Sequence, residues 1–139
     1  MLSYISLKVY TNFGTLPFIP NSMPAKAFHK AVLSPNKAII CDWSIVELRR
    51  VYNKKWPNKI VFLEAFIALL ATTAEIVETP PDTEAFPEES LIRDECDRPI
   101  LRAALKNNCD YLLTGDKDFL ESGITYPVVK NPADLVNNC

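Results

Sequence analysis

The chain of 139 residues contains a single histidine, His29, and no Asp or Glu before Asp42. Catalysis that needs several imidazoles is therefore excluded, and so is a histidine-rich zinc site. The four cysteines show no Cys-x-x-Cys spacing. We interpret them as reduced thiols of a cytosolic protein and not as a disulfide framework.

A long apolar run is also lacking. The apolar stretch at residues 60–71 is interrupted by Glu64. It is shorter than the roughly 20 residues that cross a bilayer. The chain does not begin with a basic region followed by an apolar segment, so no signal peptide is predicted. We therefore expect a cytoplasmic protein without a membrane partner.

Charge and composition are those of a soluble globular protein, with 48% hydrophobic and 23% charged residues. The formal net charge of −2 argues against a generally basic protein that coats DNA. RNA stays open as a transient substrate, because a bound metal ion and a local basic patch can offset the acids.

Strand and helix patterns alternate along the chain. Strands are predicted at 5–10, 37–41, 75–78, 111–114 and 126–129. Helices are predicted at 24–33, 44–55, 59–73, 96–107 and in a short turn after Asp118. Strands separated by helices imply a parallel sheet covered on both faces. We predict one α/β domain over residues 1–139, a three-layer α/β/α sandwich with a central parallel sheet and an atypical segment at 1–22.

Two aspartates stand where this fold places ligand-binding residues. Asp97 opens a helix whose apolar stripe, Ile100, Leu101 and Ala104, faces the core. Asp116 follows an apolar strand at the turn allowed by Gly115. Residues past strand ends and at helix starts line one crevice, so these carboxylates can converge. Converging carboxylates repel one another unless a cation neutralises them, and oxygen ligands suit Mg²⁺ or Mn²⁺.

Each acid also has an ordinary structural interpretation. Asp94 and Asp97 can serve as helix N-caps, and Asp118 can cap the following turn. Glu47 has the spacing of a capping box with Ser44. For each acid considered alone, the capping role is the better interpretation. A functional site is favoured only by the order in which all these acids occur along the chain.

The segments 97–104 (DRPILRAA) and 113–120 (LTGDKDFL) resemble motifs of the PIN-domain family, metal-dependent nucleases that include toxins of toxin–antitoxin pairs. The segment 43–51 (WSIVELRRV) is similar to that family's second motif. The resemblance covers about residues 24–135, and its most specific part is the Thr-Gly-Asp-Lys-Asp-Phe sequence. It implies the PIN-like fold, a Mg²⁺ or Mn²⁺ cofactor, an RNA substrate and a cognate antitoxin.

Carried over onto this sequence, the resemblance assigns roles to individual residues. Glu47, Asp97 and Asp116 become the catalytic and metal-binding acids, and Asp94 an auxiliary metal ligand. Thr114 and Asp118 become supporting residues.

The chain departs from the family at its first strand, which in the family ends with an aspartate. Here Lys8-Val9-Tyr10 runs into Thr11-Asn12 without an acid. Three explanations stay open: a relative that no longer cuts, a compensating acid from elsewhere, or a sequence altered at its start. Asp42 is not an obvious replacement, because it belongs to the end of the second strand.

Two further features have two interpretations each. Arg49 and Arg50, within a cluster of basic residues, can contact RNA phosphates or can form an ordinary solvated helix face. The helix at 60–71 carries too much apolar surface for one buried stripe. It is either wholly inside the protein or forms a contact with an antitoxin or with a second copy in a homodimer.

The leading hypothesis is therefore a metal-dependent ribonuclease that hydrolyses RNA phosphodiester bonds as the toxin of a toxin–antitoxin pair. The alternative is a catalytically degenerate PIN-like domain that acts as a protein- or RNA-binding module. A phosphatase-like or receiver-like domain is disfavoured, because those also need an aspartate at the end of a strand and the first strand offers none.

Overall fold

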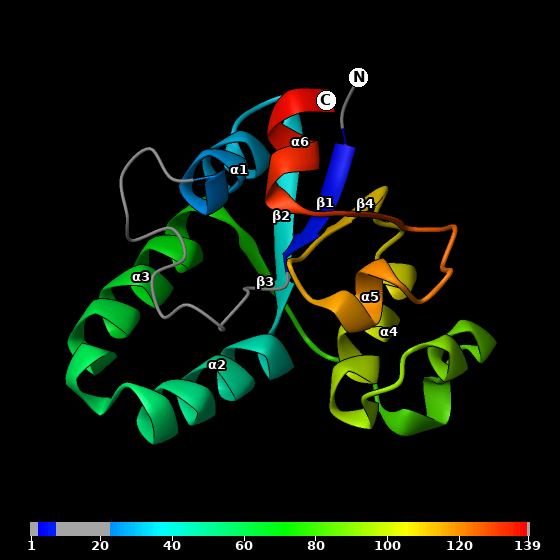
Figure 1. The fold of residues 1–139 in the computed structure, drawn as a ribbon, viewed down its shortest axis with the longest axis horizontal. Coiled ribbons are helices and arrows are strands. Elements are labelled where there is room, and N and C mark those ends of the chain that lie inside the picture. The colour runs from blue at the N-terminus through cyan, green and yellow to red at the C-terminus, as the bar shows by residue number, and fades with distance from the viewer. Residues whose placement is uncertain (1–2, 8–22, 139) are drawn as a thin grey trace.

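A parallel sheet of five strands, in the order β3-β2-β1-β4-β5, forms the middle layer of the protein (Figure 1). The computed structural model describes residues 3–7 and 23–138. The strands are β1 (Ser3–Leu7), β2 (Asn36–Cys41), β3 (Glu75–Val77), β4 (Tyr111–Leu113) and β5 (Val128–Lys130). The first strand lies at the centre, where it pairs with β2 on one side and with β4 on the other.

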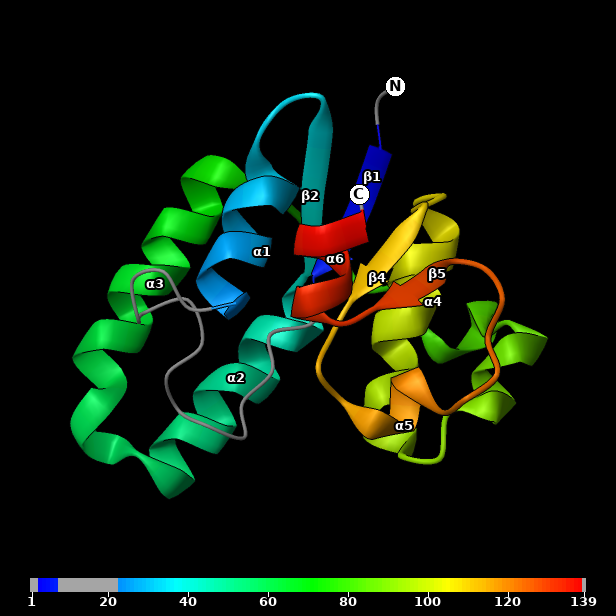
Figure 2. The same cartoon turned by 45° about the horizontal axis from the view of Figure 1, so that its top comes forward.

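Helices cover both faces of this sheet (Figure 2). One layer contains α1 (Met23–Val32), α2 (Asp42–Lys55), α3 (Ile60–Thr73) and α6 (Pro132–Asn138). The other contains α4 (Arg98–Lys106) and α5 (Lys117–Leu120). Short 3-10 turns complete the chain: η2 (Pro57–Lys59), η3 (Asp82–Glu84), η4 (Pro87–Leu91) and η5 (Glu95–Asp97).

The strand β2 shows why buried residues pack on each face of the sheet. Successive side chains of a strand point to opposite faces of the sheet. Ala38 and Ile40 belong to the core beneath α1, α2 and α3, whereas Cys41 belongs to the core beneath α4. A strand that is buried on both faces must be apolar at every position, as this one is from Ala38 onward. The predicted three-layer α/β/α sandwich is confirmed.

One local prediction, the capping box, is wrong, and another, the end of the first strand, lies outside the described residues. The helix α2 begins at Asp42, so Ser44 lies inside it, and the predicted capping box with Glu47 is wrong. Ser44 is buried instead, with its hydroxyl 3.4 Å from the Cys41 thiol. The first strand was expected to reach Tyr10, but residues 8–22 lie outside the described residues.

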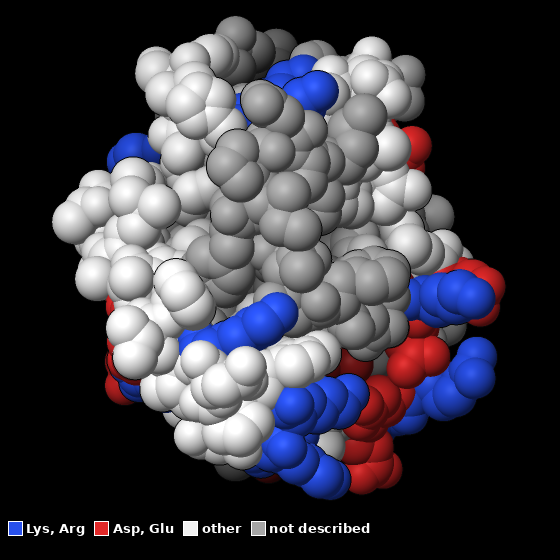
Figure 3. Space-filling view, turned by 60° about the vertical axis from the view of Figure 1, so that its left-hand side comes forward, with Lys and Arg blue, Asp and Glu red and all other residues white. Residues whose placement is uncertain are grey.

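The helix α3 is not wholly inside the protein. Leu63, Phe66 and Leu70 pack into the core, and Phe66 meets Phe28 edge to face with 5.4 Å between ring centres. On its outer side Val61 is 79% and Phe62 is 63% exposed. Among the described residues in Figure 3, uncharged side chains prevail at the left of the view, while Lys and Arg gather together with acids toward the lower edge. Within the described residues, no helix is long and apolar enough to cross a membrane.

Candidate metal centre

The acidic residues lie at the carboxyl end of the sheet, near the central strand β1. The central strand β1 has β2 on one side and β4 on the other, so the chain winds away from it in two directions. In an open parallel sheet, ligands bind at such a point, outside the carboxyl ends of the strands. Asp42 directly follows β2, and Asp116 lies just beyond β4.

The turn η5 places two of the acids. The Asp94 side chain caps this turn by accepting a 3.0 Å hydrogen bond from the Cys96 backbone N–H. Pro99 then fits the first turn of α4. Ile100 and Leu101 are buried, and this anchorage holds Asp97 at only 8% exposure. The expected inward-facing stripe of this helix is confirmed.

The turn after β4 places the third acid. The buried Thr114 hydroxyl accepts a 3.0 Å hydrogen bond from the Asp116 N–H. The Asp116 carboxylate in turn caps α5 by accepting a 2.9 Å bond from the Asp118 N–H. Phe119 is 1% exposed and anchors the turn in the core. The capping role expected of Asp118 therefore belongs to Asp116.

Three carboxylates converge at this place. One oxygen from each of Asp94, Asp97 and Asp118 lies within 4.8 Å of the other two. Ligands around one Mg²⁺ lie about 2.1 Å from the ion, so neighbouring ligand oxygens stand roughly 3–4 Å apart. The three residues therefore fit a hard divalent cation after a small adjustment of their side chains. Their oxygen-only donor set suits Mg²⁺ or Mn²⁺ better than a soft metal.

The other predicted site residues have different surroundings. Asp116 is outside the group of three, and its carboxylate serves as the cap described above. Glu47 accepts hydrogen bonds of 3.1 and 2.8 Å from Arg50. Arg49 donates two bonds, of 3.0 and 2.9 Å, to Glu64. Both arginines proposed to contact RNA therefore hold ion pairs on the surface of α2.

Glu47 and two of the three carboxylates act on the same neighbour, Cys96. The charge of Asp94, more than any other cause, raises the pKa of the exposed Cys96 thiol, and Glu47 and Asp97 add to this effect. Positive charge also reaches the group, since Arg93 Nε lies 3.8 Å from Asp118 Oδ1. The Glu47 carboxylate raises the pKa of Arg50 and keeps that guanidinium charged.

Trp43 lies beside the acids, a place that the sequence analysis did not assign to it. Its indole N–H donates a 2.7 Å hydrogen bond to the Cys96 carbonyl, within the turn that carries Asp97. Trp43 stands one helical turn before Glu47, so both belong to the same side of α2. That spacing from a candidate catalytic acid was the available signal.

Comparison with known proteins supports the fold and no more. No protein-family model matches the chain, and no curated protein matches it in sequence. Among solved structures, one similar chain belongs to VapBC2 from Rickettsia felis, bound to a DNA fragment from their promoter. It shares 14% identity over 94% of this chain and 98% of that chain, with a TM-score of 0.61. PAE2754 from Pyrobaculum aerophilum shares 16% identity over 97% of this chain and 87% of that chain, with a TM-score of 0.60.

The likeness to these two structures shows the fold of the protein. Both neighbours have PIN-like folds, and they match nearly the whole of this chain. The protein therefore has a PIN-like fold, in agreement with the resemblance seen in its sequence motifs.

Proposed function

We propose that this protein is a metal-dependent ribonuclease that hydrolyses RNA phosphodiester bonds as the toxin of a toxin–antitoxin pair. The observation that carries the proposal is the convergence of Asp94, Asp97 and Asp118 at the carboxyl end of the sheet. The sequence motifs support the same conclusion, and the similarity to VapBC2 supports the fold that it requires. Residues 1–139 would form one catalytic domain, acting in the cytoplasm.

The acidic residues have two proposed roles, metal binding and positioning. Asp94, Asp97 and Asp118 would hold Mg²⁺ or Mn²⁺, and Glu47 would add a fourth carboxylate from α2. Once bound, the ion supplies a water of lowered pKa and stabilises the charge that develops on the phosphodiester. Asp116 and Thr114 position Asp118, because they hold the turn from which it projects.

A second candidate function rests on one sequence observation. No acid precedes Asp42, so the carboxylate that ends the first strand in the PIN family has no counterpart. We propose that Asp118 acts as the compensating acid, because it converges with Asp94 and Asp97, and this favours the catalytic proposal. If three carboxylates do not suffice, the domain is a binding module that kept the fold and a partner surface.

The first test is calorimetric titration of Mn²⁺ into the pure protein and into Asp97→Asn. We expect saturable binding in the first and none in the second. Asp134→Asn, on α6 in the opposite helical layer, is the matched control and should bind as the unaltered protein does. Absence of binding in all three proteins would reject the enzyme and favour the binding module. Cleavage of a mixed RNA pool with and without chelator then tests the reaction itself.

We assign the partner surface to the outer side of α3. Val61, Phe62 and Leu69 are exposed there, and apolar side chains gathered on one helix face mark contact sites. The cognate antitoxin is the proposed partner, in keeping with the toxin–antitoxin assignment, and a second copy in a homodimer is the alternative. Light scattering of the purified protein at increasing concentration distinguishes a dimer from a monomer that awaits its antitoxin.

A further inference from the structure

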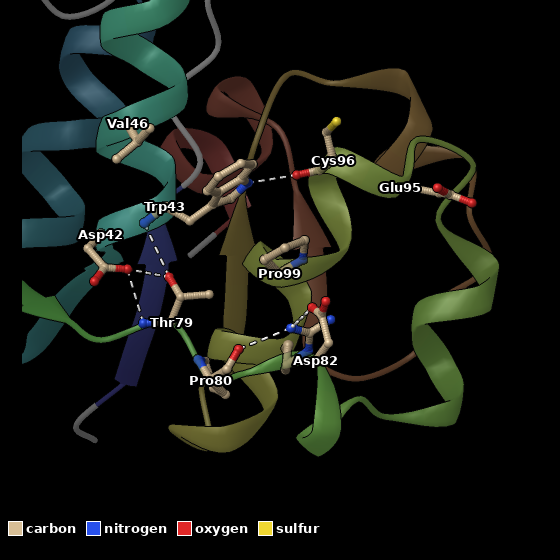
Figure 4. Close-up of a pocket in the computed structure, with 10 residues that line it drawn as sticks. Asp42, Trp43, Val46, Thr79, Pro80, Asp82, Glu95, Cys96 and Pro99 are labelled. Atoms are coloured by element: carbon tan, nitrogen blue, oxygen red, sulfur yellow. Dashed lines mark hydrogen bonds and ion pairs between the residues drawn. The ribbon is translucent and has the colours of Figure 1, made fainter.

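A cavity of about 590 Å³ lies beside the candidate metal centre. Trp43 and Val46, one turn apart on α2, form one wall, and Pro99 at the start of α4 lies across from them (Figure 4). Thr79 and Asp82, in the segment after β3, close the remaining side (Figure 4). Its volume falls within the range of about 300–1,000 Å³ that is typical of small-molecule sites.

Hydrogen bonds fix the walls of the cavity. The Thr79 N–H donates to Asp42 at 3.0 Å, and the Trp43 N–H donates to the Thr79 hydroxyl at 3.2 Å. Arg102 Nη1 donates to the Pro80 carbonyl and to Asp82 Oδ1, each at 3.0 Å. The segment after β3 is thus tied to both α2 and α4. A ligand entering the cavity does not have to pay for ordering its walls.

The cavity adjoins the three carboxylates through the turn η5. Cys96 lines the cavity and stands between Asp94 and Asp97 in the turn η5. The indole of Trp43 donates to the Cys96 carbonyl, so its ring lies at the border between the cavity and that turn. Glu47 follows Val46 directly on α2. A group held in the cavity is therefore a neighbour of whatever the carboxylates hold.

The charge of the lining excludes a phosphate. Three of the lining residues are acids, Asp42, Asp82 and Glu95. The lining cation, Arg102, is 5% exposed and binds Glu89 with hydrogen bonds of 3.1 and 2.7 Å in addition to its contacts with Asp82 and Pro80. The lining therefore offers hydrogen-bond acceptors and apolar surface, and its guanidinium is already occupied.

We infer that this cavity binds an unpaired RNA base with an exocyclic amino group, guanine before all others. The inference rests on the proposed function and deepens it, because it assigns a base-binding site next to the phosphodiester that is cut. Single-stranded RNA is read by stacking bases on aromatic side chains and by hydrogen bonds to their Watson–Crick edges. Trp43 supplies the ring, with Val46 and Pro99 as further apolar surface.

The carboxylates determine which base fits. Guanine presents two adjacent donors, N1–H and the N2 amino group, and these match the two oxygens of a carboxylate. Asp82 is the first candidate, since Arg102 donates to its Oδ1 only and the exposed side chain presents Oδ2 as an acceptor for these donors. Uracil carries two carbonyl oxygens on the same edge, and a carboxylate repels them. The expected order of affinity therefore has guanine first and uracil last.

The test uses the fluorescence of Trp43 in the Trp56→Phe background, in which Trp43 is the remaining tryptophan. Guanosine, cytidine, adenosine and uridine are titrated in the presence of chelator. We expect saturable quenching by guanosine, on the order of tenfold tighter than by uridine. These probes carry no phosphate, so the result does not depend on the metal centre. Calorimetry with Mn²⁺ decides the proposed function separately.

A matched pair of substitutions shows where the nucleosides bind. Val46→Phe fills the cavity and should abolish quenching by guanosine. Val128→Phe makes the same change at an exposed residue of β5 that does not line the cavity, and binding should be unchanged. The inference is overturned if guanosine fails to quench, or if Val46→Phe binds it as before. Saturable quenching by N-acetylarginine amide without any by nucleosides also overturns it, since the cavity would then take a cationic side chain of a protein partner.

Discussion

The indole Nε1 of Trp43 donates a 2.7 Å hydrogen bond to the carbonyl oxygen of Cys96, a residue 53 positions further along the chain. This bond joins the first turn of α2 to the turn η5. Glu47 lies on the first of these elements, and Asp94 and Asp97 lie on the second. The distance between the two sets of acids therefore depends on this contact.

Removing that donor should loosen the site. Trp43→Phe keeps an aromatic ring but loses the N–H, and we expect the free energy of unfolding to fall by about 1 kcal/mol. Binding of Mn²⁺ should weaken as well, because the turn η5 loses a tether to α2. Chemical denaturation and calorimetry measure the two effects. Trp56→Phe makes the same change away from the acids, and it should leave Mn²⁺ affinity as it is.

The two aspartates of the Thr-Gly-Asp-Lys-Asp sequence can be told apart. Asp118→Asn removes a carboxylate of the converging group and should weaken Mn²⁺ binding on the order of tenfold or more. Asp116→Asn should weaken it less, since asparagine caps a helix about as well as aspartate and the turn is retained. Calorimetry on both variants provides the comparison. The reverse order of effects would restore Asp116 as the direct ligand.

The buried pair of Arg102 and Glu89 should dominate the stability of the segment after β3. Both side chains are 6% exposed, with 2.7 Å between Arg102 Nη2 and Glu89 Oε1. Arg102→Met leaves the Glu89 carboxylate buried without its partner, which should cost about 3–5 kcal/mol of unfolding free energy.

A neighbouring ion pair supplies the control for this prediction. Lys106 pairs with Glu84 at 2.8 Å, but these side chains are about half exposed, at 51% and 47%. Lys106→Met should therefore cost less than about 1 kcal/mol. Urea denaturation of both variants gives the difference, and equal losses would contradict the assigned role of burial.

Cys109 should make the protein sensitive to alkaline pH. Burial, with a smaller effect of Asp110, raises the pKa of this thiol from 9.0 to about 12. The folded state therefore favours the neutral thiol, and its contribution to stability is complete below about pH 9. It is lost as the pH rises toward 12, with a slope of at most about 1.4 kcal/mol per pH unit.

Stability measured against pH for Cys109→Ala checks this. The variant should lose that part of the slope between pH 9 and 12. Cys96→Ala removes an exposed thiol whose pKa is raised without burial, and it should retain most of the slope. An unchanged slope in Cys109→Ala would mean that other groups carry the dependence.

The inner and outer sides of α3 should respond differently to truncation. Phe66 is 4% exposed, and Phe66→Ala should cost about 3–5 kcal/mol. Phe62 is 63% exposed, and Phe62→Ala should change the unfolding free energy by no more than about 0.5 kcal/mol. If the outer side is the partner surface, Phe62→Ala should also weaken association, which light scattering measures. Equal losses of stability would contradict the orientation of this helix.

The layers of the fold were predictable because the strand patterns are unambiguous. The strand β2 is apolar from Ala38 onward, as a strand buried on both faces must be, and the helices between strands force parallel pairing. The face of α3 was not predictable from its pattern. Its apolar residues occur on every side, so periodicity gives no direction, and only packing against Phe28 and the sheet decides which side is buried.

The site was predictable in outline but not in detail. Aspartates two residues apart can each cap the same short helix. The hydrogen bond from the Asp116 N–H to the Thr114 hydroxyl fixes the turn, and as a result Asp116 and not Asp118 caps α5. The spacing of Ser44 and Glu47 matches a capping box, yet the helix has already begun at Asp42. The partner of Arg102 was hidden in an acid-rich segment, where several carboxylates compete and only burial selects Glu89.

The central position of β1 has a consequence for synthesis on the ribosome. This strand is made before β4, with which it pairs through Ser6 and Leu112, two residues far apart in the sequence. Until β4 has been made, one edge of β1 stays open to pairing with other chains. Contacts between distant segments also form slowly. The nascent chain is therefore open to wrong pairing at this edge until β4 has been made.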